Sequence, residues 1–368
     1  MLSDSRLGFG MMRLAKDENG KIDPAKAIEQ VDRFLQAGFT YFDTAYAYEG
    51  SEEAVKNALV LRYPRSSYTL ADKLPAWSLE KPEDMERIFN TSLTRLGTDY
   101  LDFYLLHAIS GDNIDKYESL SAFDFIRQKK EEGKIRHIGF SFHGDAALLD
   151  QILTEHPEVE FVQLQLNYLD WENGVVQARE NYETVRAHGL PIVVMEPVKG
   201  GSLAQIQPES AAEFEAIRPE ATPSSWAFRF LLDKPGIMTI LSGMNSMEQL
   251  EDNIETFASF DALTDPEKEA IEKVTSQILA ADTIPCTKCG YCTPGCPLNI
   301  EIPQLFTAYN TQKMYGKSGS NKSYYNAHSK EPHHPASACL HCGQCESVCP
   351  QHLPIMENLE KAAAEFED

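Results

Sequence analysis

Residues 38–52 read GFTYFDTAYAYEGSE and contain one junction between a strand and a helix. The apolar run from Tyr41 to Asp43 predicts a short buried strand, and the segment Glu52 to Arg62 predicts the helix after it. The helix predicted before it runs from Pro24 to Ala37. Gly38 follows it, and glycine is common just past a helix C-terminus. The stretch is therefore one unit of a strand–helix pattern.

The same alternation continues along the chain and predicts eight strands. They are Leu7 to Met11, Tyr41 to Asp43, Tyr68 to Ala71, Leu101 to Leu106, His137 to Ser141, Phe161 to Gln165, Ile192 to Met195 and Thr239 to Leu241. Such alternation is typical of a parallel sheet, either closed into a barrel or open and doubly wound. Eight strands with crossover helices favour an α/β fold of the closed type, a (β/α)8 TIM barrel.

A composition change near residue 283 predicts a second domain. A last helix is expected over residues 265–281, and the cysteine-containing region begins directly after it. We therefore expect domains at 1–282 and 283–368. Within the second, residues 316–323, GKSGSNKS, are expected to form a flexible loop.

Charge limits the classes of partner. The chain has 56 acidic and 33 basic residues, a formal net charge of -23, which would repel nucleic acid and anionic membrane surfaces. We expect neither as a partner. Its first residues contain no basic segment followed by an apolar one, so a cytoplasmic location is expected.

All eight cysteines lie late in the chain, in two sets with the same spacing. The sets are Cys286-x2-Cys289-x2-Cys292-x3-Cys296-Pro297 and Cys339-x2-Cys342-x2-Cys345-x3-Cys349-Pro350. Both match the run of a bacterial ferredoxin, in which the fourth cysteine binds the other cluster. This rule predicts two 4Fe-4S clusters in a small bacterial-ferredoxin-like iron–sulfur domain. The first is held by Cys286, Cys289, Cys292 and Cys349, and the second by Cys339, Cys342, Cys345 and Cys296.

Two less specific interpretations of the cysteines stay open. One is a pair of zinc sites, since zinc also uses C-x2-C pairs, although it does not require three cysteines followed by Cys-Pro. The other is that the clusters have only a structural role and hold together a segment too small to form its own core.

The N-terminal region resembles the aldo-keto reductase family over roughly residues 5–260. The stretch around Asp43 and Tyr48 is similar to the family signature, in which an Asp ends the second strand and a Tyr follows five residues later. Leu70-Ala-Asp-Lys73 resembles the third-strand motif, and Asp99-Tyr-Leu-Asp-Phe-Tyr-Leu-Leu-His107 the fourth-strand motif. The resemblance implies a catalytic tetrad of Asp43, Tyr48, Lys73 and His107 at the C-terminal ends of the strands.

Chemistry gives each of these four side chains a role. Carbonyl reduction needs a proton donor beside the oxygen, and Tyr48 is the expected general acid. Because a free tyrosine has a pKa of about 10, Lys73 is expected to lower the pKa of Tyr48, with Asp43 holding Lys73 charged. His107 would position the carbonyl oxygen and share its developing charge.

The same resemblance implies a nicotinamide dinucleotide, NAD or NADP, at the barrel mouth. The implied binding residues are Ser141, Gln163, Asn167, Met195, Pro197, Gly200, Gly201, Ser242, Gly243, Asn245, Gln249 and Asn253. Many members have an aromatic residue in place of Met195 and an arginine that holds the 2′-phosphate in place of Gln249. The choice between NADP and NAD therefore stays open.

Four functions fit this combination of domains. The first is an oxidoreductase that interconverts a small carbonyl and an alcohol, with the clusters passing electrons to a redox partner protein. Its difficulty is that a hydride carries two electrons whereas each cluster moves one. The second keeps the reductase with structural or regulatory clusters. The third is a nicotinamide-binding redox sensor or adaptor, and the fourth is a cluster-driven reductase without nicotinamide.

Overall fold

The computed structural model describes residues 6–280, 282–315 and 319–367, and they form two compact units. The barrel unit contains the residues up to Glu172 together with Gln177–Pro197 and Ala227–Ala262. The cysteine unit contains Asn173–Val176, Val198–Trp226 and the residues from Leu263 onward. No helix in these described ranges is long and apolar enough to cross a membrane.

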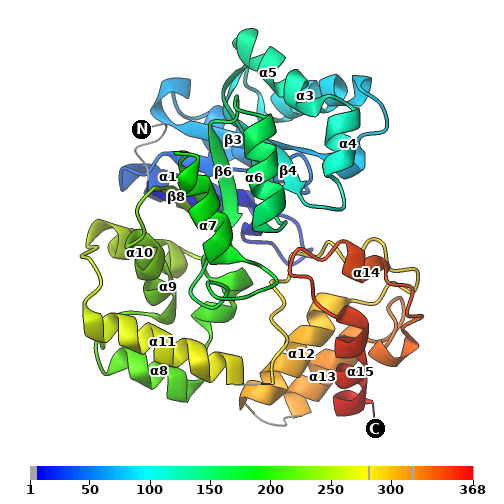
Figure 1. The fold of residues 1–368 in the computed structure, drawn as a ribbon. Coiled ribbons are helices and arrows are strands. Elements are labelled where there is room, and N and C mark those ends of the chain that lie inside the picture. The colour runs from blue at the N-terminus through cyan, green and yellow to red at the C-terminus, as the bar shows by residue number, and fades with distance from the viewer. Residues whose placement is uncertain (1–5, 281, 316–318, 368) are drawn as a thin grey trace. The chain divides into compact units, whose positions relative to one another are not determined.

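The barrel unit is built on eight parallel strands that close on themselves in chain order (Figure 1). The strands are β1 (Leu7–Gly10), β2 (Tyr41–Asp43), β3 (Thr69–Pro75), β4 (Leu101–Ile109), β5 (Ile135–Phe142), β6 (Phe161–Gln165), β7 (Ile192–Met195) and β8 (Ile237–Ser242). Closure is made by β1 and β8, which pair in parallel through Leu7 and Ile240. The predicted closed barrel is confirmed, and the open doubly wound sheet is excluded.

Helices and short turns connect these strands. They are η1 (Met11–Arg13), α1 (Pro24–Gln36), α2 (Ser51–Val55), η2 (Lys56–Val60), η3 (Arg65–Ser67), η4 (Ala76–Ser78), α3 (Glu83–Leu96), α4 (Ile114–Ser119), α5 (Ala122–Glu131), α6 (Ala146–Glu155), α7 (Ala178–Ala187), α9 (Pro223–Leu232), which runs from one unit into the other, and α10 (Met247–Ala258). Local signals explain where several begin and end. At α1, Asp23 accepts hydrogen bonds from the backbone N–H groups of Ala25 and Lys26, and α3 ends at Gly97 with φ of 70°.

One predicted helix has a different form in the structure. The segment expected as a single helix from Glu52 to Arg62 is a short α-helix followed by the π-helical turn η2. In this turn the backbone N–H of Leu61 donates to the carbonyl of Lys56, five residues earlier. The side chains of Ala58 and Leu59 in this turn are buried.

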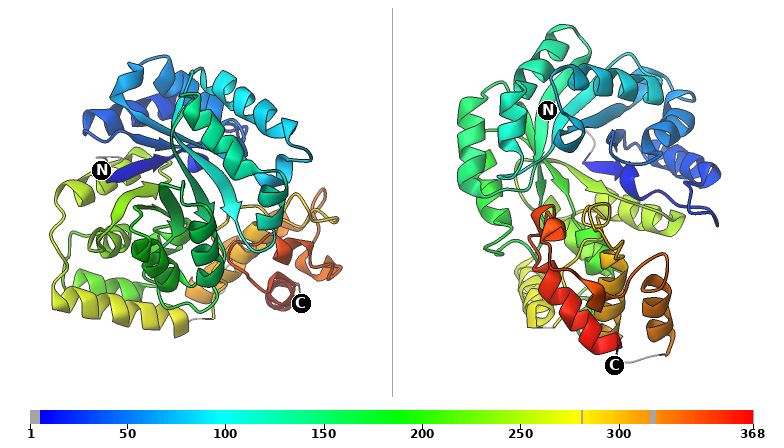
Figure 2. Two further views of the ribbon diagram at one scale, coloured as in Figure 1. Left: turned by 45° about the horizontal axis from the view of Figure 1, so that its top comes forward. Right: turned by 90° about the vertical axis from the view of Figure 1, so that its right-hand side faces the viewer.

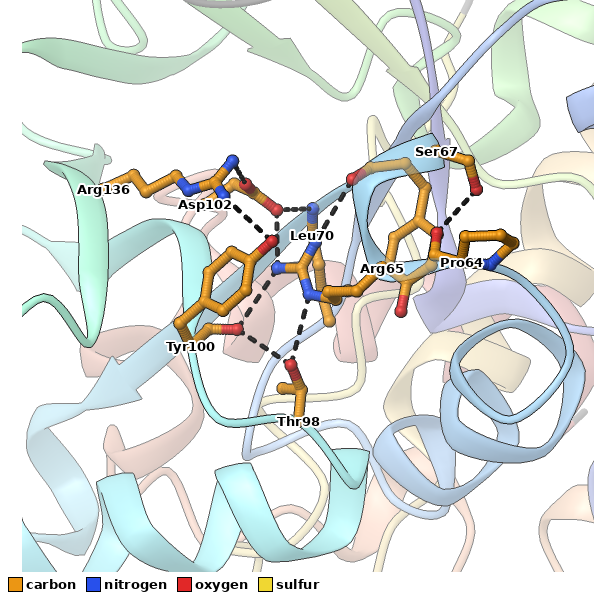
Figure 3. A network of polar contacts seen from close by, with 9 residues as sticks. Pro64, Arg65, Ser67, Leu70, Thr98, Tyr100, Asp102 and Arg136 are labelled. Atoms are coloured by element: carbon orange, nitrogen blue, oxygen red, sulfur yellow. Dashed lines mark hydrogen bonds and ion pairs between the residues drawn. The ribbon is translucent and has the colours of Figure 1, made fainter.

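A buried carboxylate joins the N-terminal ends of β3 and β4. Asp102 accepts hydrogen bonds from the Arg65 and Arg136 guanidinium groups and from the backbone N–H of Leu70 (Figure 3). Arg65 also donates to the carbonyl oxygen of Tyr100. Since active sites of such barrels lie at the opposite face, this network stabilises the fold.

The cysteine unit is helical around its own apolar core. Its elements are η5 (Lys199–Ala204), α8 (Pro208–Glu215), α11 (Asp265–Ala280), α12 (Ile302–Tyr315), α13 (Gly319–His328), η6 (Ala336–Ala338), α14 (Gln344–Ser347) and α15 (Ile355–Phe366). Helix α12 contacts both α13 and α15 (Figure 2). The core includes Leu305, Phe306, Tyr325 and Phe366.

Two predictions about this region, a flexible loop and a domain boundary, have different outcomes in the structure. Residues 316–318 lie outside the described residues, but the rest of the expected loop, from Gly319, begins helix α13 and the loop prediction there was wrong. The helix forms because it buries Tyr325, whose ring stacks on Phe366 with centroids 4.4 Å apart. The compact unit also includes segments before residue 283, and the domain boundary at 282/283 stays a prediction.

Candidate active site and cysteine cavities

The four residues of the expected tetrad come from three neighbouring strands of the barrel. Asp43 is the last residue of β2, and Tyr48 follows in the loop after it. Lys73 lies in β3, and His107 lies near the end of β4. The structure brings their side chains together.

The Lys73 ammonium is at the centre of the group. It is fully buried and lies 2.5 Å from the Asp43 carboxylate, 2.8 Å from the carbonyl oxygen of Thr44 and 3.5 Å from the Tyr48 hydroxyl. Gln163 donates to the other Asp43 oxygen at 3.1 Å. Because both charged groups are buried, the ion pair and these hydrogen bonds hold the ammonium in one position.

His107 faces the Tyr48 ring. The two ring centroids are 5.7 Å apart with the planes at 82°. Burial, followed by the charges of Lys73 and His143, holds the pKa of His107 well below its usual range. The imidazole is therefore neutral at pH 7, and a neutral imidazole carries one N–H donor.

The acidity of Tyr48 differs from the sequence-based expectation. Burial raises the pKa of Tyr48 well above its usual value, and the charges of Asp43 and Glu196 raise it further. Lys73 was expected to lower this pKa, but its ammonium is paired with Asp43 and lies a full 3.5 Å from the hydroxyl. In this state Tyr48 is a neutral phenol, the form that can donate a proton.

Several side chains expected to bind the dinucleotide already have partners inside the barrel unit. Ser141 accepts from the backbone N–H of Ala108 at 2.7 Å, and Gln163 is the partner of Asp43. Asn167 donates to Asp170 and to the carbonyl oxygen of Glu196. The hydrogen bonds fix these amide and hydroxyl groups in orientation.

A second group of expected residues lies at the end of β8 and in the segment that follows it. Ser242 is buried and accepts from Asn253 at 2.9 Å, and Gly243 lies beside the Arg13 side chain. Asn245 and Gln249 are exposed, and the Gln249 side chain accepts from the backbone N–H of Asn245.

The expected residues around the end of β7 are divided between the units. Met195 ends β7 and Pro197 is buried, both in the barrel unit. Gly200 and Gly201 belong to the cysteine unit, with φ of 65° and 97°. A role of these two glycines in dinucleotide binding stays a prediction.

Four functional candidates were missed by the sequence. Arg13 pairs with Glu196 at 3.3 Å, and Trp77 places its ring centroid 5.1 Å from that of His107. The Tyr117 hydroxyl accepts the backbone N–H of His107 at 3.0 Å, and Asp170 accepts from Asn167. Trp77 could have been found because it directly follows the third strand, whereas Arg13, Tyr117 and Asp170 carry no motif.

The eight cysteines converge on two cavities in the cysteine unit. The lining of the first includes Cys286, Cys289, Cys292 and Cys349. The lining of the second includes Cys296, Cys339, Cys342 and Cys345. These are the two groups of four that the crossover rule predicts.

Burial favours the protonated thiol at several of these cysteines. Burial raises the pKa of Cys286 and Cys292 to about 12 and of Cys345 to about 11. An iron–sulfur cluster bound here would have to offset this burial, because its ligands are thiolates. Backbone N–H groups assist, with Lys288 donating to the Cys286 sulfur and Ile300 to the Cys296 sulfur at 3.4 Å.

Comparison with known proteins agrees with this geometry. The sequence profile of the Aldo/keto reductase family matches residues 6–276, most of the chain. The chain belongs to this family. The profile of a 4Fe-4S dicluster domain matches residues 285–353. The molecule is thus an oxidoreductase of the aldo/keto reductase family that carries a 4Fe-4S domain.

Relatives and solved structures cover the barrel of this aldo/keto reductase. The uncharacterized oxidoreductase YqkF of Bacillus subtilis is 27% identical over 313 residues, which cover 75% of this chain and 94% of that protein. L-galactose dehydrogenase of Arabidopsis thaliana is 24% identical, with 71% and 87% covered. The holo form of aldo-keto reductase AKR11C1 from Bacillus halodurans superposes with a TM-score of 0.59 at 26% identity, covering 73% of this chain and 91% of its own. An aldo-keto reductase from Klebsiella pneumoniae in complex with NADPH shares the fold, with a TM-score of 0.57 at 23% identity and coverage of 73% and 90%.

Proposed function

We propose that this aldo/keto reductase interconverts a small carbonyl compound and its alcohol with NAD or NADP, and that Tyr48 is the general acid and base. The single observation that carries the proposal is the buried Lys73 ammonium, which lies between the Asp43 carboxylate and the Tyr48 hydroxyl. A lysine fixed in this way is poised to stabilise a phenolate without itself giving up its position.

The barrel residues fit a nicotinamide dinucleotide. Ser141, Gln163 and Asn167 present buried polar groups that are already fixed by hydrogen bonds. A bound nicotinamide supplies a hydride for reduction and accepts one in oxidation. Gln249 is exposed and uncharged, and the proposal leaves NAD and NADP as equal candidates.

In the reductive direction, the chain's own residues handle the proton and the developing charge. The neutral His107 donates a hydrogen bond to the carbonyl oxygen. The O–H bond of Tyr48 then breaks as its proton passes to that oxygen, and the phenolate left behind faces Lys73. In the oxidative direction the Tyr48 phenolate takes the proton from the alcohol.

We also propose that residues 283–368 form an iron–sulfur domain with two 4Fe-4S clusters. One is held by Cys286, Cys289, Cys292 and Cys349, and the other by Cys296, Cys339, Cys342 and Cys345. The cysteine spacing and the match to a 4Fe-4S dicluster domain support clusters over zinc, because a zinc site does not require three cysteines at C-x2-C-x2-C followed by Cys-Pro.

The clusters are proposed to exchange single electrons with a redox partner protein. Thiolate clusters of this kind persist in a reducing compartment, so the cytoplasm is the proposed location. A hydride carries two electrons, whereas each cluster transfers one. This proposal requires a step that couples the two, and structural clusters or a cluster-driven reductase without nicotinamide would not require it.

The test is Tyr48→Phe in protein with a full complement of iron. We expect the rate of carbonyl reduction to fall by about 10²- to 10⁴-fold while the dinucleotide dissociation constant stays unchanged. Tyr46→Phe serves as a control, because it removes a tyrosine hydroxyl from the same loop without removing the proposed proton donor. A Tyr48→Phe variant with the parental rate would overturn the role of Tyr48.

A further inference from the structure

The loop that follows β7 contacts the first cysteine cavity through its backbone. At Gly200 a side-chain carbon would lie 2.1 Å from the carbonyl oxygen of Thr287 and 2.6 Å from its carbonyl carbon. Thr287 is buried, directly follows Cys286 and lines the first cavity. Only glycine permits this approach, and its φ of 65° is also one that glycine adopts without strain.

A second contact is made by the residue before it. Lys199 is 2% exposed, and its ammonium donates to the Gln351 side-chain oxygen at 3.0 Å. Gln351 is 6% exposed, lies two residues after Cys349 and lines the same cavity. The loop thus reaches the cavity beside each of the two chain segments that provide its thiols.

A lysine buried at this place changes the electrostatics of whatever fills the cavity. A four-iron cluster bound by four thiolates is anionic, and one-electron reduction adds a further negative charge. A nearby buried cation interacts more strongly with the more negative form, because the surroundings screen little. The anionic cluster in turn offsets the desolvation of the ammonium.

We propose that Lys199, held by Gln351, is a positioning residue that stabilises the reduced form of the first cluster and so raises its potential. The step is the gain of one electron by the cluster, with no bond made or broken and no proton taken up. The proposal rests on the proposed two-cluster function. It makes the first cluster, beside Lys199 and Gly200, the preferred place for an electron delivered by an external one-electron donor.

The experiment compares cluster potentials in the full-length holoprotein. Potentiometric reduction with dithionite, followed by EPR and visible absorption, resolves two one-electron components. In Lys199→Met we expect the reduced-to-oxidised ratio of one component, at the wild-type midpoint, to fall about tenfold, which corresponds to about 59 mV for one electron. The other component should stay in place.

Two further variants make the result specific. Gln351→Glu keeps the size of the side chain but places a carboxylate on the ammonium, and it should shift the same component in the same direction. Lys361→Met removes a charge from the exposed side of α15, where Lys361 pairs with Glu357, and should shift neither component.

The outcomes separate this inference from the proposed function. If both components stay at their wild-type potentials in Lys199→Met and Gln351→Glu, or if both shift equally, the role of Lys199 is refuted. If Lys199→Met loses iron, Gln351→Glu alone decides. If wild-type protein shows no pair of reducible components, the two-cluster function itself fails.

Discussion

Gly200→Ala adds one methyl group where two backbone segments of the cysteine unit meet. The new carbon would lie 2.1 Å from the Thr287 oxygen, against the 3.0 Å that real contacts of this kind do not fall below. The loop must therefore withdraw by about 0.9 Å, and the Lys199–Gln351 hydrogen bond would lengthen from 3.0 Å to about 3.9 Å, beyond hydrogen-bonding range.

As a consequence, the segment that carries Lys199 would hold the cysteine-bearing segments of the first cavity less firmly. A hydrogen bond to a charged group contributes about 1.5–3 kcal/mol, and each 1.4 kcal/mol is a factor of ten. If iron leaves through local opening, its release from the first cluster should be about 10- to 100-fold faster in Gly200→Ala. The assay is anaerobic iron transfer to a chelator, followed by visible absorption.

Gly201→Ala is the matched control. Gly201 also has a positive φ, of 97°, so an alanine is strained there too, but no atom lies within 4 Å of the added carbon. Its iron release should stay near the wild-type rate. Equal rates in Gly200→Ala and wild type, or equal acceleration in both variants, would refute the reasoning.

Three further predictions concern the barrel unit. Asp43→Asn leaves the Lys73 ammonium buried without a carboxylate and should lower the free energy of unfolding, measured in urea, by about 3–5 kcal/mol. A double variant with Lys73→Met should recover part of this loss. An unchanged unfolding midpoint would contradict the ion pair. Glu196→Gln removes a negative charge that raises the pKa of Tyr48, so the alkaline rise of alcohol oxidation should move to lower pH, and a move to higher pH would contradict it. Asp102→Asn weakens the network at the opposite face and should cost about 1–3 kcal/mol in stability with KM unchanged, while a changed KM would place it in the site.

Strand positions were predictable where the strands are buried on both sides. β2, β6 and β7 match the predicted bounds, because short apolar runs between polar segments mark buried parallel strands. β3 and β4 extend further than predicted. Lys73 and His107 look like the ends of strands in the sequence, yet both lie inside strands, because the pairing of β3 with β4 continues as far as Pro75 and His107.

The candidate site was predictable in its residue types and less so in its contacts. The tetrad could be found because its residues lie in sequence motifs that resemble those of the family. Arg13–Glu196 and Lys199–Gln351 join residues 183 and 152 positions apart, and no local pattern connects such residues. The raised pKa of Tyr48 depends mainly on burial, which the sequence does not specify for one side chain.

Transfer of deuterium tests the proposed reaction most directly. NADH and NADPH labelled with deuterium at the transferable position of the nicotinamide are given anaerobically to cluster-loaded protein with a panel of small carbonyl compounds, and the alcohols are analysed by mass spectrometry. We expect deuterium on the carbinol carbon in wild-type protein and little product in Tyr48→Phe. Unlabelled alcohol, formed only when the clusters are chemically reduced, would contradict it and support a cluster-driven reductase instead.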